Sequence, residues 1–366
     1  MTAVHLVRGP DRGDAVEGLA SQVEAAGGAR VGVPGVLDDL NRTATLARVP
    51  ARAARWGFRW DDQDQSSERW WPQGVTTSGD VSVGGSHGGS VGPRHDRQVV
   101  CTSWYAKPVD GEARGSRVTF VDVSDPARLR YRHVLLVDVR LGEDGRVQMS
   151  PLTVHAGGLV WHGDHLFVAG TMRGVSVVRA EDVLRVPDGS DRNEWFGYRY
   201  VLPVRFHYEG RAEEGVERMR YSFLSLARDA ATADGRLGGT RLVAGEYARG
   251  GSGGTTRLLE LPFDPATSLL REGPDGIRPW ARHRTGVEAM QGAVLVGGTW
   301  FLATSAGRFR PGSLHVGRPP RLRRHLWALP VGVEDLAHWP ERDEIWSQSE
   351  YPGRRFVFAM DRARWV

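Results

Sequence analysis

Lysine is almost missing from this sequence. Of the 48 lysine and arginine residues, only Lys107 is a lysine, and the formal net charge is +4. Schiff-base chemistry could therefore use only this residue. The near-complete use of arginine is typical of the coding bias of a GC-rich genome, so we expect no nucleic-acid partner. The densest basic cluster, which contains Arg318, Arg321, Arg323 and Arg324, is interpreted as a solvated loop.

Cysteine and long apolar runs are equally scarce. Cys101, the only cysteine, lies in the apolar run VVCTSWY, which excludes an internal disulfide and a cysteine-based zinc site. No apolar stretch approaches the roughly 18 residues of a membrane-spanning helix. The first residues, MTAVHLVRGPDRGD, lack the basic-then-apolar pattern of a signal peptide. We therefore expect a cytoplasmic monomer without a membrane partner.

Several cofactor fingerprints are also missing. Neither a GxxxxGK phosphate loop nor a GxGxxG dinucleotide motif occurs between a predicted strand and a helix. The segment DDQDQSSE at 61–68 has an Asp-x-Asp spacing but lacks the glycine and the final glutamate of a calcium loop. It is interpreted as a solvated strand exit, and no redox cofactor is expected.

Glycine, tryptophan and short alternating stretches dominate what is present. The chain has 47 glycines and 13 tryptophans, and from Arg55 onward short apolar alternations are broken by Gly, Pro, Asp and Asn. This pattern predicts many short strands. Residues 1–53 are weakly patterned and are interpreted as an N-terminal extension, with a possible short helix in GVLDDLNRTATLARV.

A unit of four strands recurs along the rest of the chain. The first unit reads PQGVTTS, VVCTSWYAK, RVTFVDVSDP and YRHVLLVDV, and later units begin at VHAGGLVWHGDH, YSFLSLARD, MQGAVLVGG and VEDLAHWPERDE. Tandem four-stranded antiparallel units predict an all-β, five-bladed β-propeller over residues 54–366. The third unit has a poorly defined fourth strand near Trp280, and the last lacks its outer strand. ARWGFRW at 54–60 is expected to supply it and close the ring.

Gln-Gly opens two of these units, and glycine allows backbones to crowd around a narrow axis. The glycine-rich run at 79–98 is expected to be a long loop between the first two strands of the first blade.

The motifs PQGVTTS, SWY, HAGG, QGA and VEDL resemble those of a group of actinobacterial five-bladed propeller proteins, often described as hypothetical or secreted. The resemblance covers residues 54–366. It implies the fold but hardly any function, since propellers host unrelated activities.

The fold predicts where a site lies. In each blade the inner strand begins, and the second strand ends, on the same face over the central channel. Polar and aromatic residues gather at these positions and are expected to bind a ligand. The predicted ligand-site residues are Gln73, Trp104, Tyr105, His155, Thr171, Arg173, Ser222, Glu246, Tyr247, Gln291, Ser305, Arg308, Glu334, Asp335, Glu350 and Tyr351.

Five of these residues are candidates for acid–base catalysis: His155, Glu246, Glu334, Asp335 and Glu350. Structural interpretations stay open beside this one. His155 can equally be a satisfied channel histidine, and the glutamines can bond the backbones of neighbouring blades. Adjacent strand residues face opposite ways, so only one residue of the pair Glu334 and Asp335, and only one of the pair Trp104 and Tyr105, is expected to face the channel.

A metal at the axis is a further possibility. Amide and carboxylate oxygens from several blades suit Ca²⁺, which takes six to eight oxygen ligands. The candidate ligands are Gln73, Gln291, and Glu334 or Asp335.

These residues favour a small-molecule enzyme, of the lyase, cyclase or isomerase type, acting on a small organic or sugar-like molecule in specialised metabolism. One alternative is a propeller that binds a glycan or small ligand without turnover. Another is a glycoside hydrolase, although related enzymes place three acids on separate inner strands and here only the last unit offers one. A Ser-His-Asp arrangement of Ser222 or Ser225, His155 and Asp335 is a weaker alternative.

Overall fold

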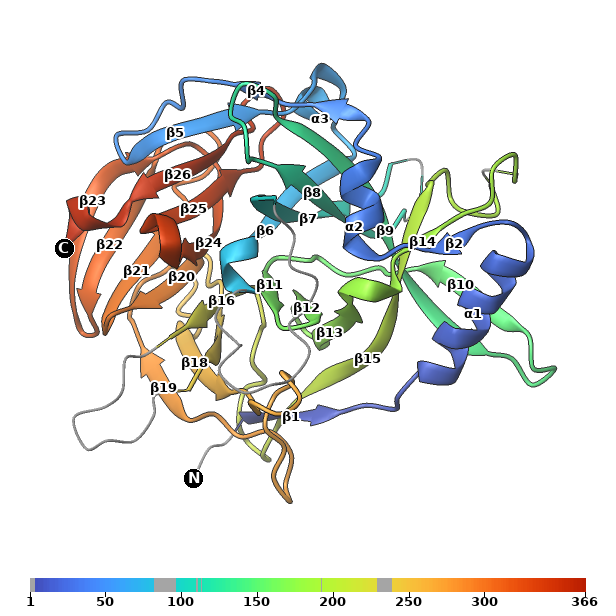
Figure 1. Ribbon diagram of the computed structural model, residues 1–366. Helices are drawn as coiled ribbons and strands as arrows, with labels where there is room; N and C mark the ends of the chain where they lie inside the picture. Colours follow the sequence, from blue (N-terminus) through green and yellow to red (C-terminus); the bar gives the residue numbers. More distant parts are fainter. Residues whose placement is uncertain (1–3, 82–96, 110, 113, 192, 229–238) are drawn as a thin grey trace.

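The computed structural model describes residues 4–81, 97–109, 111–112, 114–191, 193–228 and 239–366. Its core is a β-propeller, in which antiparallel sheets surround one axis (Figure 1). This confirms the predicted all-β propeller class. Within these residues no helix is both long and apolar enough to cross a membrane. The glycine-rich stretch expected to be a loop lies, over 82–96, outside the described residues.

Each sheet follows the chain from the axis outwards, as the repeated strand pattern predicts. Short apolar strands joined by tight turns produce this order because consecutive strands pair as hairpins. The first two units comprise β6 (Trp70–Thr77), β7 (Val99–Ala106), β8 (Ser116–Asp122) and β9 (Arg130–Leu141), then β11 (Leu159–His162), β12 (His165–Ala169), β13 (Gly174–Arg179) and β15 (Tyr200–Ala212).

The remaining units repeat the same order. In the third unit the fourth strand, β19 (Ala281–Arg284), follows directly after Trp280, where the sequence pattern was least defined. The strands are β16 (Phe223–Ala227), β17 (Arg241–Gly245), β18 (Arg257–Pro262) and β19 (Ala281–Arg284), then β20 (Met290–Val296), β21 (Thr299–Thr304), β22 (Gly312–Arg318) and β23 (Arg321–Leu329), then β24 (Val333–Trp339), β25 (Glu344–Ser349) and β26 (Val357–Asp361).

The arginine cluster near Arg321 therefore does not form a loop, because it spans the β22–β23 hairpin. Its side chains remain largely solvated, since the burial pattern of β23 is mostly exposed.

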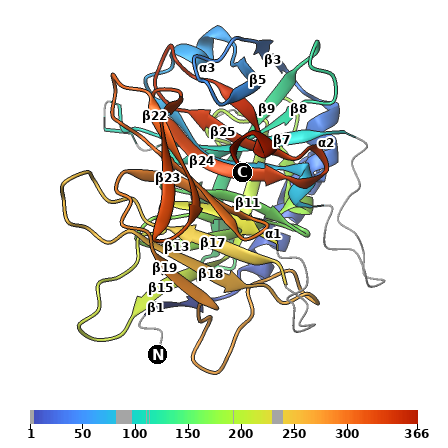
Figure 2. The same ribbon diagram turned by 90° about the vertical axis from the view of Figure 1, so that its left-hand side faces the viewer.

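The N-terminal strand β5 (Ala54–Arg59) pairs antiparallel with β26, with Phe58 opposite Val357. The opposite edge of β5 pairs with the short strand β4 (Thr45–Leu46). The segment ARWGFRW therefore lies beside the last strand of the chain, as the sequence predicts. In both views α3 (Asp62–Ser66) and β5 lie near the top of the molecule, opposite β1 (Figures 1 and 2).

The first two units are not independent blades, which the sequence pattern did not predict. Strand β15 is long enough to pair twice: Val201–Pro203 run parallel to Leu135–Val137 of β9, and the later residues pair antiparallel with β13. The hairpin strand β10 (Val147–Pro151) extends β9 further. The outer strands thus join both units into one sheet.

Residues before β5 are folded onto this joined sheet. Strand β1 (Val4–Arg8) pairs with β15, and α1 (Gly13–Ala25) lies outside β9 and β10 (Figure 1). The helix buries Val16, Leu19, Ala20 and Val23, the i, i+3, i+4, i+7 spacing of an amphipathic helix. Sequence analysis missed α1. The short helix that it expected within 35–49 is present only over 35–38, the end of α2 (Gly32–Asp38), because the chain beyond Asp38 turns into the short strands β3 (Arg42–Thr43) and β4.

Two short strands complete this region. Strand β2 (Ala29–Arg30) pairs with β14 (Leu184–Arg185), and β3 (Arg42–Thr43) pairs with β9. Every element of the N-terminal segment therefore meets the propeller, and it adds strands and helices to the outside of the sheets.

The innermost strands meet around the axis. Strand β6 contacts β11 and β24, and β16 and β20 contact the remaining neighbours in turn. Gly74 lies where a Cβ would come within 2.6 Å of the backbone of Gly158 and Leu159, and a Cβ on Gly292 would lie 2.7 Å from the Leu336 nitrogen. These distances confirm the interpretation of the Gln-Gly pairs, since only glycine permits such close approach.

Candidate functional site

A cavity of about 370 Å³ opens where inner strands begin and second strands end. Its walls come from segments that span most of the propeller, so the fold and not local sequence brings them together. Ten of the predicted residues line this one cavity: Gln73, Tyr105, His155, Thr171, Ser222, Tyr247, Gln291, Glu334, Glu350 and Tyr351.

Trp71 and Lys107 also line the cavity, and sequence analysis missed both. The signal was present in the spacing. Trp71 precedes Gln73 by two residues, and Lys107 follows Tyr105 by two. Side chains two apart on a strand share one face. Trp71 and Tyr105 also face each other as paired residues of β6 and β7.

Two carboxyl groups enter the cavity, each beside a glutamine amide. Gln73 Nε2 donates to Glu350 Oε2 at 3.0 Å, and also to the carbonyl of Pro72 at 2.9 Å. Gln291 Nε2 donates to Glu334 Oε1 at 3.4 Å. The glutamines therefore orient the acids, in addition to any role in joining blades.

These acids influence each other's protonation. Burial, reinforced by the charge of Glu350, raises the pKa of Glu334 well above its usual range. Burial also raises the pKa of Glu350, although Gln73 and Lys107 oppose this shift. Two carboxyl groups in one poorly solvated space cannot both ionise easily. The pair therefore favours one protonated acid beside one carboxylate.

Aromatic rings form another wall. The rings of Tyr105 and His155 stack with their centroids 4.2 Å apart and their planes at 25°. Burial, followed by the charge of Lys107, lowers the pKa of His155, so its imidazole is neutral near pH 7. Tyr351 meets Trp71 edge to face at 5.8 Å, and burial with Glu350 raises the pKa of Tyr351 to about 12. Neutral, flat surfaces thus face the two acids.

Trp104, which was predicted to bind ligand, does not line the cavity. It is fully buried because it points to the opposite face of β7 from Tyr105. There it packs against Trp60 and His133 and lies under the guanidinium of Arg117. Trp104 is therefore a core residue.

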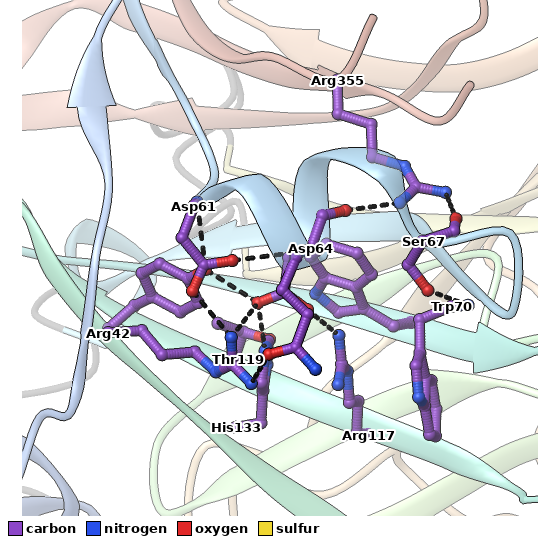
Figure 3. A network of polar contacts seen from close by, with 12 residues as sticks. Arg42, Asp61, Asp64, Ser67, Trp70, Arg117, Thr119, His133 and Arg355 are labelled. Carbon is purple, nitrogen blue, oxygen red and sulfur yellow. Dashed lines mark hydrogen bonds and ion pairs between the residues drawn. The ribbon is translucent and has the colours of Figure 1, made fainter. Parts of the chain in front are cut away.

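The segment 61–68 is not a solvated strand exit, which corrects the sequence interpretation. Residues Asp62–Ser66 form helix α3, whose first turn is capped by the side chain of Asp61 accepting from the Asp64 amide. Asp64 is buried and accepts a hydrogen bond from Arg117 at 2.8 Å (Figure 3). It also accepts one from the Tyr131 hydroxyl at 2.7 Å. The helix is thus fixed by a buried carboxylate.

His133 completes this network. Its Nε2 lies 2.8 Å from Asp64 and its Nδ1 lies 2.7 Å from the hydroxyl of Thr119 (Figure 3). Against the cost of burial, His133 and Arg117 hold the pKa of Asp64 well below its usual range. The arrangement resembles a catalytic relay, but Thr119 has no exposed surface, so it serves as structure.

Arg355 connects the network to the cavity. Its guanidinium is completely buried and donates to the carbonyls of Asp64 and Ser67 in the α3 region. Its Nε donates to the carbonyl of Glu350 at 2.7 Å. One buried cation thus fixes the main chain that carries Glu350, by tying it to α3.

Two predicted catalytic acids have structural roles. Glu246 is fully buried in a bidentate pair with Arg257, with both N–O distances 2.8 Å, and it does not line the cavity. Asp335 is also buried, and its Oδ2 accepts from the backbone amides of Val75 and Leu159 at 3.4 and 3.3 Å. Of the adjacent acids on β24, Glu334 is the one that reaches the cavity.

Three other predicted ligand residues lie outside this cavity. Arg173 is exposed in the turn that follows β12. Ser305 lines a separate pocket with His315 and Arg324. Arg308 is exposed beyond the rim, with its guanidinium carbon 6.0 Å from the ring centroid of Tyr351. The second strands differ in length, from five residues in β12 to eight in β7, which simple position counting does not capture.

The predicted calcium ligands do not fit a metal site. Gln73 and Gln291 turn their amide nitrogens toward the acids, and Asp335 accepts backbone hydrogen bonds outside the cavity. Among the described residues, no group of three or more His, Cys, Asp or Glu side chains is arranged to hold a metal. Calcium needs six or more oxygens, and this set does not provide them.

The Ser-His-Asp alternative also fails on geometry. Ser225 is buried and donates to the carbonyl of Ala293 in the neighbouring unit. Asp335 is engaged by backbone amides, whereas His155 stacks on Tyr105. Ser222 Oγ donates to the carbonyl of Arg220 at 3.4 Å and accepts from the Tyr247 amide at 3.1 Å. Within the described chain, no hydrogen bond joins either serine to His155, or His155 to Asp335.

No protein-family model matches the chain. No curated protein matches it either. Among solved structures, a gluconolactonase from Xanthomonas campestris is 15% identical, with 88% of this chain and 84% of that chain covered and a TM-score of 0.36. The β-propeller domain of Cps50 (Swd1) from Myceliophteria thermophila is 11% identical, with 81% and 98% covered and a TM-score of 0.35. A GH43_1 enzyme from Xanthomonas citri is 10% identical, with 84% and 90% covered and a TM-score of 0.35. Similarities this distant carry no argument about function.

Proposed function

We propose that the cavity is the active site of an enzyme that transforms a small, polar organic molecule by general acid–base catalysis. The observation that carries this proposal is the pair of carboxyl groups, Glu334 and Glu350, in one cavity of about 370 Å³. The pKa values of both are raised, and the charge of Glu350 raises that of Glu334. Titratable pairs that perturb each other in a cleft are typical of catalytic sites.

The roles follow from the environments. Glu334, the more deeply buried acid, serves as the proton donor, and Glu350, next to Lys107 and Gln73, serves as the carboxylate base. Tyr105, His155 and the remaining rings exclude water and face the bound molecule. A proton donor and a base in one cavity suit reactions that proceed by proton transfers, such as those of lyases, cyclases and isomerases.

We also infer that the whole chain from β5 onward is one five-bladed propeller closed by its N-terminal strand. The pairing of β5 with β26 supports this, and so do the contacts of β6 with both β11 and β24. Closure matters for the site because Gln73 comes from the first blade and Glu350 from the last.

Glycoside hydrolysis is a second candidate, favoured by one observation. Such hydrolysis requires two carboxyl groups, one protonated as the general acid and one ionised as the base or nucleophile, and this cavity holds two. The third acid expected on a separate inner strand is replaced by Gln73 or Gln291. A site that binds a sugar-like molecule without turnover is the remaining alternative.

The test is a turnover screen with the purified full chain, read by liquid chromatography coupled to mass spectrometry so that isomers of equal mass are separated. The panel contains sugars, sugar lactones, aryl glycosides, hydroxy acids and keto acids. We expect conversion of at least one class, reduced about 100-fold or more in Glu334→Gln, since general acid–base groups contribute on that order. The matched control is Glu344→Gln, a buried acid of β25 paired with Arg342 at 2.9 Å outside the cavity.

The alternatives give different results. Conversion confined to aryl glycosides assigns hydrolysis. Binding of a panel member, seen as a thermal shift that Glu334→Gln abolishes, without any conversion, assigns a binding propeller. Equal activity in the Glu334 and Glu344 variants overturns the assignment of the acid.

A further inference from the structure

The only lysine of the chain lies in the cavity. Every other one of the 48 basic residues is arginine, and Lys107 lines the cavity at the end of β7, beside Tyr105. Arginine binds anions and acceptors at least as well as lysine does, but it cannot lose its proton in a protein. A lysine at this one position is therefore consistent with a task that a guanidinium cannot perform, namely reaction as a neutral amine.

The surroundings of the amine leave it available. Lys107 Nζ lies over the ring of Trp71, 2.9 Å from the ring centroid. In the part of the chain that the structure describes, this nitrogen makes no ion pair or hydrogen bond. The ring of Trp71 covers one side of the amine, and both residues line the cavity, so a molecule bound there lies beside the amine.

Both positive and negative side chains surround the Lys107 amine. Burial lowers the pKa of Lys107, and the carboxylates of Glu350 and Glu68 oppose this shift. The positive charges of Arg308 and Arg355 lower the pKa further. In its protonated form Lys107 also lowers the pKa of His155. A lysine amine that is partly desolvated gains neutral fraction, which is how Schiff-base lysines are activated.

We propose that Lys107 forms an imine with the carbonyl carbon of an aldehyde or ketone substrate bound in this cavity. The inference rests on the proposed acid–base function and narrows its substrate class to carbonyl compounds. The geometry points to it through the unpaired amine, the ring of Trp71 and the acids Glu334 and Glu350, which all line one cavity.

The step balances with groups in the cavity. The neutral Nζ attacks the carbonyl carbon, the C–N bond forms, and the carbonyl oxygen takes a proton from a carboxylic acid. The nitrogen then loses a proton to a carboxylate, and a second proton transfer to the hydroxyl releases water as the C=N bond forms. The protonated imine makes the neighbouring C–H acidic, so the carboxylate of Glu350 can remove that proton. Hydrolysis reverses the sequence and restores the amine.

The experiment uses 2,4-pentanedione, a small diketone that condenses with neutral amines to a stable enaminone and water. The wild-type protein is labelled at several pH values, and peptide mapping locates the adduct. The reference is the single variant Arg128→Lys, in which the introduced amine is solvated, because the side chain of Arg128 is 85% exposed. We expect Lys107 to react at least tenfold faster than this reference at pH 7, with its rate reaching half maximum at lower pH.

A second measurement tests imine formation itself. Glycolaldehyde and pyruvate are offered with sodium borohydride, and the reduced adduct is mapped. We expect the adduct on Lys107, and none at position 107 in Lys107→Arg, which keeps the positive charge. Labelling of Lys107 no faster than the Arg128→Lys reference amine overturns the proposal, as does turnover that survives in Lys107→Arg. Turnover that needs Glu334 but not Lys107 leaves the acid–base function standing without the imine.

Discussion

The side-chain amide of Gln73 donates a 3.0 Å hydrogen bond to the carboxylate of Glu350, although the two residues lie 277 positions apart. Gln73 stands on the first inner strand and Glu350 follows the second strand of the last unit. This single contact joins the two ends of the propeller sequence at the cavity. It also favours the charged form of Glu350, since the donor stabilises the carboxylate.

Replacement of this donor tests the proposed role of Glu350 as the catalytic base. In Gln73→Leu the hydrogen bond is lost, so the pKa of Glu350 rises further. If Glu350 is the base, as proposed, we expect the acidic limb of the turnover profile to move to higher pH. The profile of kcat against pH measures this, with exposed Gln148→Leu as the control. An acidic limb that stays in place removes Glu350 from the role of base.

A variant of His155, the histidine that stacks on Tyr105, distinguishes a catalytic role from a binding role. His155→Ala removes a neutral imidazole from the cavity wall and leaves both acids in place. If His155 transfers protons, we expect kcat to fall by about 100-fold or more, with ligand binding weakened less than tenfold. Calorimetry and turnover on the same preparation compare these effects. A parallel loss of both quantities identifies His155 as a binding residue only.

The glycine that precedes Val75 tests the packing around the axis. A Cβ in Gly74→Ala would meet the backbone of Gly158 and Leu159 at 2.6 Å, and neither main chain can move aside easily. We expect a loss of about 3 kcal/mol or more in the free energy of unfolding, at the upper end of overpacking costs.

Denaturant unfolding measures this loss. The matched control is Gly239→Ala, where a Cβ has nothing within 4 Å and the backbone is not left-handed. Equal stability of the two variants contradicts the close approach of the inner strands.

Buried histidines predict how stability changes with acid. Burial lowers the pKa of His133, His162 and His315 to about 4. The unfolded chain takes up protons on histidine near pH 6.5, so stability is fully present above this pH and is lost as the pH falls toward 4. Each fully protected histidine contributes at most about 1.4 kcal/mol per pH unit in this window.

Unfolding in guanidinium at pH 7.5, 6 and 5 measures the slope. In His162→Phe we expect a shallower slope, because the ring packs against Phe263 at 4.1 Å and a phenyl group keeps this contact without titrating. A slope identical to that of the wild-type protein contradicts the protection of His162.

Much of the site could be predicted from the sequence because the propeller class fixes which strand ends share a face. Gln73, Tyr105 and Gln291 follow from the four-strand repeat alone. The two-residue period of a strand also places Trp71 and Lys107 on the same face as Gln73 and Tyr105.

Other features depended on partners that the repeat does not encode. Glu246 is withdrawn from the cavity by Arg257, and Asp335 by the amides of two neighbouring inner strands. Asp64 looked like a solvated residue because its partners, Arg117 and His133, lie on β8 and β9. Charge pairing across the fold cannot be derived from a local pattern. The parallel pairing of β15 with β9 was not predicted either, because it joins strands of two different repeat units.

Whether the cavity performs acid–base catalysis is tested by the turnover of the panel by Glu334→Gln beside Glu344→Gln. We expect conversion of a small polar molecule by the wild-type protein and by Glu344→Gln, and a loss of about 100-fold or more in Glu334→Gln. Conversion that is unchanged in Glu334→Gln, with both variants folded as the wild-type protein, would contradict it.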